Sequence, residues 1–248
     1  MEYNRKEEIK RRTKKLKEKN VRKMLKIAHR GAMGHELENT VKAFKKSIEL
    51  SVDMIELDVR KCKTGEPVVF HDPTVNRLTN GEGRIEEKTI QQIKKLKLRN
   101  GEKIPTLKEA LKTINRETKV NIELKGSGTP EPVAKTIKKH IKEKGWKTKD
   151  FLSTSFKHHR LKKLNRHVSG IKKGLITIGT PHNLETPVEN IDIGYILPHK
   201  EFITEEMIKD AHKKDLKIFT WTVNQKEEIE KFKEMNVDGI ITDYPERI

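Results

Sequence analysis

Residues 52–72, VDMIELDVRKCKTGEPVVFHD, are the most informative part of the chain about its expected fold. They hold two apolar runs of the kind that form buried strands, Met54–Arg60 and Val68–His71. Only Lys61–Pro67 separates them, whereas a crossover between parallel strands needs about a dozen residues or more. Because Thr64-Gly65 in this gap is a turn signal, we expect the second run to return beside the first as an antiparallel hairpin.

The register of this hairpin follows from the position of the turn. Counting outward from a turn at residues 63–66 pairs Cys62 with Pro67 and Asp58 with His71. That register would place an imidazole beside a carboxylate at the open end of the hairpin, within reach of a cross-strand contact.

Around this stretch, strand-like runs alternate with amphipathic helix-like runs, which is typical of a parallel sheet covered by helices. The other expected strands are Leu25–His29, Val120–Lys125, Phe151–Ser155, Gly174–Ile178, Ile193–Leu197, Ile218–Thr222 and Gly239–Asp243. The expected helices are Thr40–Leu50, Leu107–Ile114, Val133–Lys144, His158–Asn165, Glu205–Lys213 and Lys226–Met235. Setting the hairpin strand aside leaves eight parallel strands, which predicts a (β/α)8 TIM barrel over residues 25–248, with residues 76–103 as an excursion.

Composition narrows the class of protein. Of the 248 residues, 33% are hydrophobic and 37% charged, yet apolar runs recur along the chain, which excludes a fully disordered polypeptide. No run approaches the ~18 apolar residues of a membrane span, and the first 25 residues are too polar for a signal peptide. Cys62 is the single cysteine, so no intrachain disulfide can form. We therefore expect a cytoplasmic protein.

Basic residues outnumber acidic ones by 55 to 37, a formal net charge of +18, which mostly indicates solvated helix faces. Residues 1–25 hold eleven Lys or Arg and four Glu. The same segment has a thin apolar stripe at helical spacing, formed by Ile9, Leu16, Val21 and Met24. We expect residues 1–24 to form a basic helical extension packed under the barrel, with peripheral contact with an anionic membrane as the alternative.

Polar side chains occupy the carboxyl ends of the first expected strands, where the active site of a TIM barrel lies. They are His29, Arg30, Glu56, Asp58, His71, Glu123 and Lys125. Residues i and i+2 of a strand share a face, so Glu56 and Asp58 should point together, as should Glu123 and Lys125. Three converging carboxylates would repel one another unless a hard divalent cation, Mg²⁺ or Ca²⁺, binds them.

The remaining polar side chains suit chemistry at a phosphorus atom. Arg30 and Lys125 add fixed positive charge that can hold phosphate oxygens. His29 and His71 titrate near neutral pH and can move protons. Together with a bound cation, these groups favour in-line attack on a phosphate ester.

The chain also resembles the glycerophosphodiester phosphodiesterase family, over about Ile27 to Ile248. The segments that carry the resemblance, in family order, are His29-Arg30-Gly31 followed by Asn39-Thr40, Glu56-Leu57-Asp58-Val59, Pro67-Val68-Val69-Phe70-His71-Asp72, Ile104-Pro105-Thr106-Leu107, Glu123-Leu124-Lys125, Trp221-Thr222-Val223-Asn224 and Thr242-Asp243-Tyr244-Pro245. Each segment alone is a weak signal, whereas the ordered set is highly specific.

The resemblance implies a TIM barrel that hydrolyses glycerophosphodiesters to sn-glycerol 3-phosphate and an alcohol. It implies one divalent metal held by the residues at Glu56, Asp58 and Glu123, and an acid–base pair at His29 and His71. The residues alone do not distinguish the base from the acid; we favour His29 as the base and His71 as the acid. Arg30 and Lys125 match phosphate-contacting positions, and Trp221 matches a position near the glycerol, with barrel packing as an equally good interpretation.

One segment departs from the family pattern, because Leu37 stands where the family usually has Pro before Glu-Asn-Thr. We expect the loop to be looser and Asn39 to cap the helix that begins at Thr40. Glu38 either approaches the metal or the glycerol, or simply places a favourable charge at a helix N-terminus.

Two other functions fit parts of the sequence. One is a phosphodiesterase of the same barrel that acts on a lysophospholipid headgroup. The other is a non-catalytic barrel that binds a polyanion, although no nucleic-acid partner is expected because only 5% of residues are aromatic and no nucleic-acid motif is present. The sequence does not determine the alcohol, the choice between Mg²⁺ and Ca²⁺, or the oligomeric state.

Overall fold

The computed structural model describes residues 23–179 and 193–248 of the chain. Eight parallel strands close into a barrel with the order β1-β2-β4-β5-β6-β7-β8-β9, because β1 pairs with both β2 and β9. The strands are β1 (Leu25–Ala28), β2 (Met54–Lys61), β3 (Pro67–Val69), β4 (Lys119–Leu124), β5 (Phe151–Ser155), β6 (Lys172–Thr177), β7 (Ile193–Pro198), β8 (Lys217–Thr220) and β9 (Gly239–Thr242). The predicted TIM barrel is confirmed.

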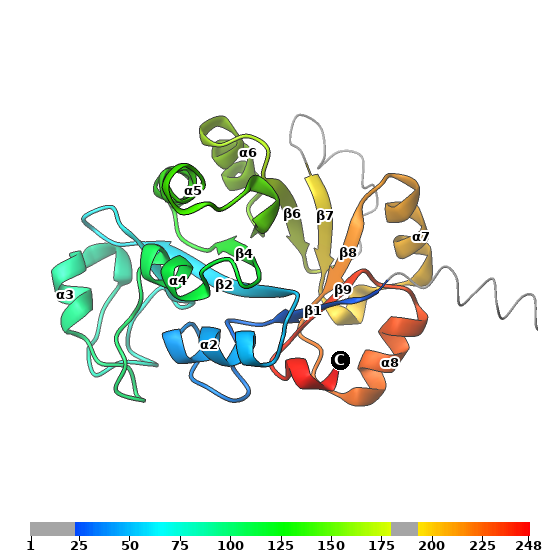
Figure 1. The fold of residues 1–248 in the computed structure, drawn as a ribbon, viewed down its shortest axis with the longest axis horizontal. Helices are drawn as coiled ribbons and strands as arrows, with labels where there is room; N and C mark the ends of the chain where they lie inside the picture. Colours follow the sequence, from blue (N-terminus) through cyan, green and yellow to red (C-terminus); the bar gives the residue numbers. More distant parts are fainter. Residues whose placement is uncertain (1–22, 180–192) are drawn as a thin grey trace, which may run out of the picture.

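Helices cover the outside of the barrel (Figure 1). They are α2 (Val41–Glu49), α3 (Ile90–Lys95), α4 (Leu107–Ile114), α5 (Pro130–Lys144), α6 (His158–His167), α7 (Glu205–Lys213) and α8 (Lys226–Glu234). Four short 3-10 helices lie at Ile85–Glu87, Thr148–Asp150, Lys200–Phe202 and Pro245–Arg247. Helix α5 begins three residues earlier than expected, because a proline in the first turn lacks only an amide hydrogen that the turn does not use.

The hairpin forms as predicted, but its register is shifted by one residue. β3 runs antiparallel to β2 and pairs Lys61 with Pro67. Continuing this register places Phe70 opposite Asp58, and the Phe70 amide donates to the Asp58 carbonyl at 2.9 Å. The expected pairing of Asp58 with His71 is therefore wrong. The turn is one residue shorter than expected, since Gly65 adopts φ 101° and closes a tight loop that other residues would strain.

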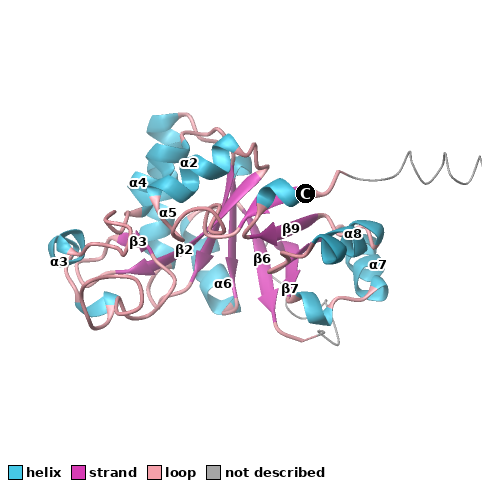
Figure 2. Ribbon diagram, turned by 90° about the horizontal axis from the view of Figure 1, so that it is seen from below, coloured by secondary structure: helices cyan, strands magenta, loops and turns pink. Residues whose placement is uncertain are grey.

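Three apolar cores hold these layers together. The largest lies between the barrel strands and the surrounding helices, and the second fills the barrel interior with residues that include Leu152, Leu197 and Phe219. The third core belongs to the excursion that follows the hairpin, which projects to one side of the barrel with α3 (Figures 1 and 2). Leu37 packs against this third core, so the residue that replaces the expected proline is anchored rather than loose.

Most strands end one residue or more before the expected position, so that His29, His71 and Asp243 lie in the loops that leave the barrel. The predicted basic helix falls outside the described residues except for its last two, Lys23 and Met24, which lead into β1 as coil. Within residues 23–179 and 193–248, no helix has the length and apolar character needed to cross a membrane.

Candidate active site

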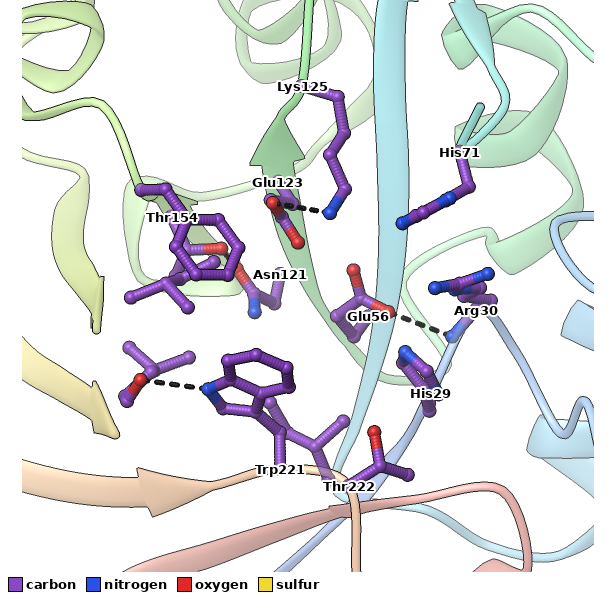
Figure 3. Close-up of a pocket in the computed structure, with 14 residues that line it drawn as sticks. His29, Arg30, Glu56, His71, Asn121, Glu123, Lys125, Thr154, Trp221 and Thr222 are labelled. Carbon is purple, nitrogen blue, oxygen red and sulfur yellow. Dashed lines mark hydrogen bonds and ion pairs between the residues drawn. The ribbon is translucent and has the colours of Figure 1, made fainter. Parts of the chain in front are cut away.

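A cavity of about 240 Å³ opens at the carboxyl ends of the barrel strands. Its lining residues are His29, Arg30, Glu56, His71, Asn121, Glu123, Lys125, Thr154, Phe156, Ile176, Leu197, Trp221, Thr222 and Ile241. Seven of the eight residues predicted for the site are among them, and the eighth, Asp58, is buried next to Glu56 and Glu123. Figure 3 shows the side chains converging from strands on all sides of the barrel.

The three carboxylates come from two neighbouring strands. Glu56 and Asp58 share one face of β2, and the parallel register with β4 places Asp58 beside Glu123. One oxygen from each carboxylate lies within 4.8 Å of the other two, and all three side chains are buried. Oxygen donors at this spacing could hold a hard divalent cation.

Burial and mutual repulsion give these carboxylates unequal acidities. Burial, followed by the charges of Asp58 and Glu123, raises the pKa of Glu56 well above its usual value. Burial and the charge of Asp58 raise the pKa of Glu123 to about 7. Asp58 is also buried, but Lys125 and Arg30 outweigh that cost and lower its pKa. Without a cation, therefore, the cluster favours protons on its two glutamates.

A cation fits this cluster on structural grounds. The Oε1 atom of Glu56 is buried and has no hydrogen-bond partner within the part of the chain that the structure describes. A buried carboxylate oxygen without a partner is costly. A bound divalent cation would satisfy this oxygen and replace the protons that the glutamates otherwise retain.

Two cationic side chains lie against the carboxylates and approach different oxygens of Asp58. The Nζ atom of Lys125 lies 2.8 Å from Glu123 Oε1 and 3.6 Å from Asp58 Oδ1. The Nε atom of Arg30 lies 3.3 Å from Asp58 Oδ2. The backbone of Arg30 adopts φ 50°, which is uncommon outside glycine, and its amide donates to Glu56 Oε2 at 2.8 Å. This strained turn directs both the amide and the guanidinium of Arg30 to the cluster.

Both predicted histidines are held by a carboxylate through Nδ1. His29 Nδ1 lies 2.7 Å from Asp243 Oδ1, and His71 Nδ1 lies 2.7 Å from Asp72 Oδ1. Asn224 in turn donates to the other oxygen of Asp243 at 2.7 Å. Each imidazole therefore keeps Nε2 available for proton transfer at the cavity. Burial, more than any neighbouring charge, lowers the pKa of His71.

A chain of ion pairs connects Arg30 to the carboxylate that holds His71. Glu38 is buried and accepts from Arg30 Nη1 at 2.8 Å and from both terminal nitrogens of Arg77, also at 2.8 Å. The Nε atom of Arg77 donates to Asp72 Oδ2 at 2.6 Å. Hydrogen bonds and charge from Arg77 and His71 overcome partial burial and lower the pKa of Asp72 to about 2.

This network corrects two expectations for the loop before α2. Thr40 caps the helix, because its side chain accepts from the Ala43 amide. Asn39 instead donates from Nδ2 to Asp58 Oδ2 at 2.9 Å. Glu38 pairs with two arginines rather than acting as a free charge at the helix terminus, and its hydrogen bonds hold the loop to the site.

The opposite side of the cavity is an apolar wall, formed by Phe156, Ile176, Leu197, Trp221 and Ile241. Trp221 donates from Nε1 to the Leu197 carbonyl at 2.9 Å, and its ring meets Phe156 edge-on at 5.6 Å between centroids. Trp221 therefore both lines the cavity and packs against neighbouring strands, so its two sequence interpretations are compatible.

The sequence analysis assigned no role to several polar residues of the site, among them Asp72, Arg77, Asn121, Thr154 and Asp243. Two of them had a signal, since Asp72 adjoins His71 and Asp243 follows the last strand at the same end of the barrel. Asn121 also had one, because it lies two residues before Glu123 and so shares its face. No local sequence pattern pointed to Arg77 or Thr154, because the residues that they bind lie on other elements.

Comparison with known proteins identifies this constellation. Residues 29–247 match the model of the glycerophosphoryl diester phosphodiesterase family. A glycerophosphodiester phosphodiesterase from Caldanaerobacter subterraneus subsp. tengcongensis is 37% identical over 238 residues, covering 91% of this chain and 96% of that protein. A putative glycerophosphodiester phosphodiesterase from Bacillus subtilis is 32% identical, with coverages of 90% and 95%.

A solved structure agrees with these sequence relatives. A phosphodiesterase from Oleispira antarctica, in complex with the product sn-glycerol-3-phosphate, superposes with a TM-score of 0.83 at 27% identity. The alignment covers 90% of this chain and 94% of that one. The chain therefore belongs to the glycerophosphoryl diester phosphodiesterase family and is a phosphoric diester hydrolase.

Proposed function

We propose that this protein hydrolyses glycerophosphodiesters to sn-glycerol 3-phosphate and an alcohol, with one divalent cation, Mg²⁺ or Ca²⁺, held by Glu56, Asp58 and Glu123. The observation that carries the proposal is the convergence of three buried carboxylates and two carboxylate-held histidines on one cavity. The sn-glycerol-3-phosphate in the related Oleispira antarctica structure supports the choice of product.

When bound, the cation would supply positive charge to the phosphate oxygens. Arg30 and Lys125 would hold the same phosphate from either side, since both cationic groups already lie within 3.6 Å of Asp58. Their charges would stabilise the additional negative charge that develops at the phosphorus as water attacks.

His29 is the base in this proposal and His71 is the acid. His29 Nε2 takes a proton from the attacking water, while the bond from phosphorus to the alcohol oxygen breaks. His71 Nε2 gives its proton to that oxygen, so the alcohol leaves neutral and the phosphate remains on the glycerol.

The partners of the two histidines support this assignment. Asp243 accepts from His29 Nδ1 through Oδ1, and Asn224 donates to its other oxygen, so the His29 ring is held with Nε2 left to accept a proton from water. Asp72 shares its charge with Arg77, and burial lowers the pKa of His71. A lowered pKa makes protonated His71 a stronger proton donor than an ordinary imidazolium.

A turnover assay tests the proposal. The full chain, supplied with Mg²⁺ or Ca²⁺, is incubated with glycerophosphocholine, glycerophosphoethanolamine, glycerophosphoinositol and a lysophospholipid. Released sn-glycerol 3-phosphate is measured with a coupled dehydrogenase, and we expect it from at least one glycerophosphodiester. Release of a phosphorylated headgroup and free glycerol would show cleavage of the wrong bond, and turnover of the lysophospholipid alone would favour the alternative substrate class.

A further inference from the structure

An amide at the floor of the cavity has no role in the chemistry described above. Asn121 lies on β4, two residues before Glu123, and its register partner on β2 is Glu56. The side chain is 1% exposed and lines the cavity (Figure 3). Its Nδ2 atom is buried and has no hydrogen-bond partner among residues 23–179 and 193–248. An unpaired buried N–H group is costly, so it points to a ligand.

A neighbouring strand sets the orientation of this amide. Thr154 on β5 donates from Oγ1 to Asn121 Oδ1 at 3.0 Å. The amide oxygen is thereby occupied, and the N–H groups face the cavity.

The position of Asn121 indicates which part of a substrate it meets. It lies deeper in the barrel than Glu123, level with Glu56 on the neighbouring strand. On one side are the carboxylates, and on the other is the apolar wall of Phe156, Ile176, Leu197, Trp221 and Ile241. The variable alcohol of a glycerophosphodiester must face the open mouth, because it differs in size between substrates. The glycerol is the constant part, and its hydroxyl groups need donors while its carbons suit an apolar wall.

We infer that Asn121 is a specificity-determining residue that donates a hydrogen bond from Nδ2 to a glycerol hydroxyl, and that Thr154 is the residue that positions it. The inference rests on the proposed function, since it assumes a glycerol-containing substrate. It assigns recognition of the glycerol to a group outside the carboxylate, histidine and cation set.

Calorimetric titration of the metal-loaded full chain tests the inference without turnover. The two probes are sn-glycerol 3-phosphate and n-propyl phosphate, which has the same phosphate and carbon count but no hydroxyl. We expect the wild-type protein to prefer sn-glycerol 3-phosphate by roughly tenfold, the value of one good hydrogen bond. Asn121→Ala should lose most of this preference by weakening only the binding of sn-glycerol 3-phosphate.

Variants of Thr154 separate positioning from packing. Thr154→Val keeps the shape but removes the donor that holds the amide, so it should reduce the preference while leaving n-propyl phosphate binding in place. Thr154→Ser keeps the hydroxyl and should restore the preference. A structural role alone predicts that both variants weaken both probes equally.

Three results would overturn the inference: a wild-type protein that binds both probes equally, an Asn121→Ala variant that keeps the preference, or a loss of Mg²⁺ affinity of more than about tenfold in that variant. The last result would mean that Asn121 serves the metal. A wild-type protein that prefers sn-glycerol 3-phosphate but turns over no glycerophosphodiester contradicts the proposed function and leaves the role of Asn121 intact. Turnover with an unchanged preference in Asn121→Ala contradicts only the role of Asn121.

Discussion

The two sides of the cavity are built on opposite principles. The charged face carries His29, Arg30, Glu56, Asp58, His71, Glu123 and Lys125 from the first four strands, and almost every polar atom there has a named partner. The apolar wall on β5 to β9 contributes mainly carbon surface, with a side-chain hydrogen bond from Trp221. Under the proposed function, reactivity and recognition would therefore be divided: the fixed charges would act on the phosphate, while the wall would exclude water and so strengthen those charges.

The largest expected effect comes from removing the centre of the charged face. EDTA should abolish activity, and Mg²⁺, Mn²⁺ or Ca²⁺ should restore it. Glu56→Gln should lower kcat/KM on the order of 10³-fold or more, because several kcal/mol of charge stabilisation depend on the ion. Steady-state assays with protein that has been stripped of metal measure both effects. Full activity of Glu56→Gln in EDTA would remove the metal from the mechanism.

Loss of either histidine should rank second. His29→Ala and His71→Ala should each lower kcat by about 10²- to 10⁴-fold, the range for one lost acid or base. The pH–rate profile should be bell-shaped in the wild-type protein and lose one limb in each variant. An alanine variant with a near wild-type kcat would make that histidine structural.

The ion-pair chain from Arg30 to His71 should matter less than the groups it positions. Arg77→Ala removes one partner each of Glu38 and Asp72, so we expect kcat to fall about 10- to 100-fold through misplacement of His71. The pKa of Asp72, now about 2, should rise because Arg77 contributes to its depression. NMR titration of the carboxyl carbon measures this rise.

A control for Arg77 is available in the same excursion. Arg84 forms an exposed ion pair with Glu86, with 2.8 Å between Arg84 Nε and Glu86 Oε1. Arg84→Ala should leave kcat unchanged, since exposed pairs contribute little. Equal losses in the two variants would mean that the whole excursion, and not the chain of ion pairs, supports catalysis.

Changes in the apolar wall should alter binding more than chemistry. Trp221→Phe keeps an aromatic surface but loses the hydrogen bond to the Leu197 carbonyl. We expect KM to rise about fivefold with kcat nearly unchanged. The chain's other tryptophan, Trp146, stacks on Phe151 at 4.9 Å away from the cavity, so Trp146→Phe should leave KM unaltered. A fall in kcat for Trp221→Phe would place the wall in the chemistry.

The smallest effect concerns stability and pH in metal-free protein. Folding raises the pKa of Glu123 to about 7 from an ordinary value near 4.5. Between these values the folded state binds more protons than the unfolded state, so stability falls as pH rises. Thermal melts in EDTA should show a smaller fall in Tm between pH 4.5 and 7 for Glu123→Gln than for the wild-type protein. Each kcal/mol of lost free energy of unfolding should lower Tm by about 2–4 °C.

Saturating Mg²⁺ supplies the matching control for the stability measurement. Only the wild-type protein keeps all three carboxylates, so the ion should raise its Tm more than that of Glu123→Gln. If the two proteins respond equally to pH in EDTA, Glu123 is not the group that holds the proton.

The sequence predicted much of the charged face, for reasons that can be traced to particular residues. Glu56, Asp58 and Glu123 stood out because carboxylates are rare in buried strands and because alternation puts i and i+2 on one face. His71 was placed correctly in the cavity although its predicted pairing with Asp58 was wrong. A shift of one residue changes which side chain faces the partner strand, but His71 follows the strand end, where the loop directs it.

Local pattern was enough to predict the number of strands, the hairpin after the second strand and the end of the barrel that carries the chemistry. These follow from short-range quantities, namely periodicity, gap length and turn residues. The hairpin register, the bond between His29 and Asp243 across 214 residues of chain, and the orientation of Asn121 by Thr154 depend instead on the tertiary structure. Closure of the barrel brings such partners together, and hydrogen-bond geometry depends on tenths of an ångström that spacing along a chain does not encode.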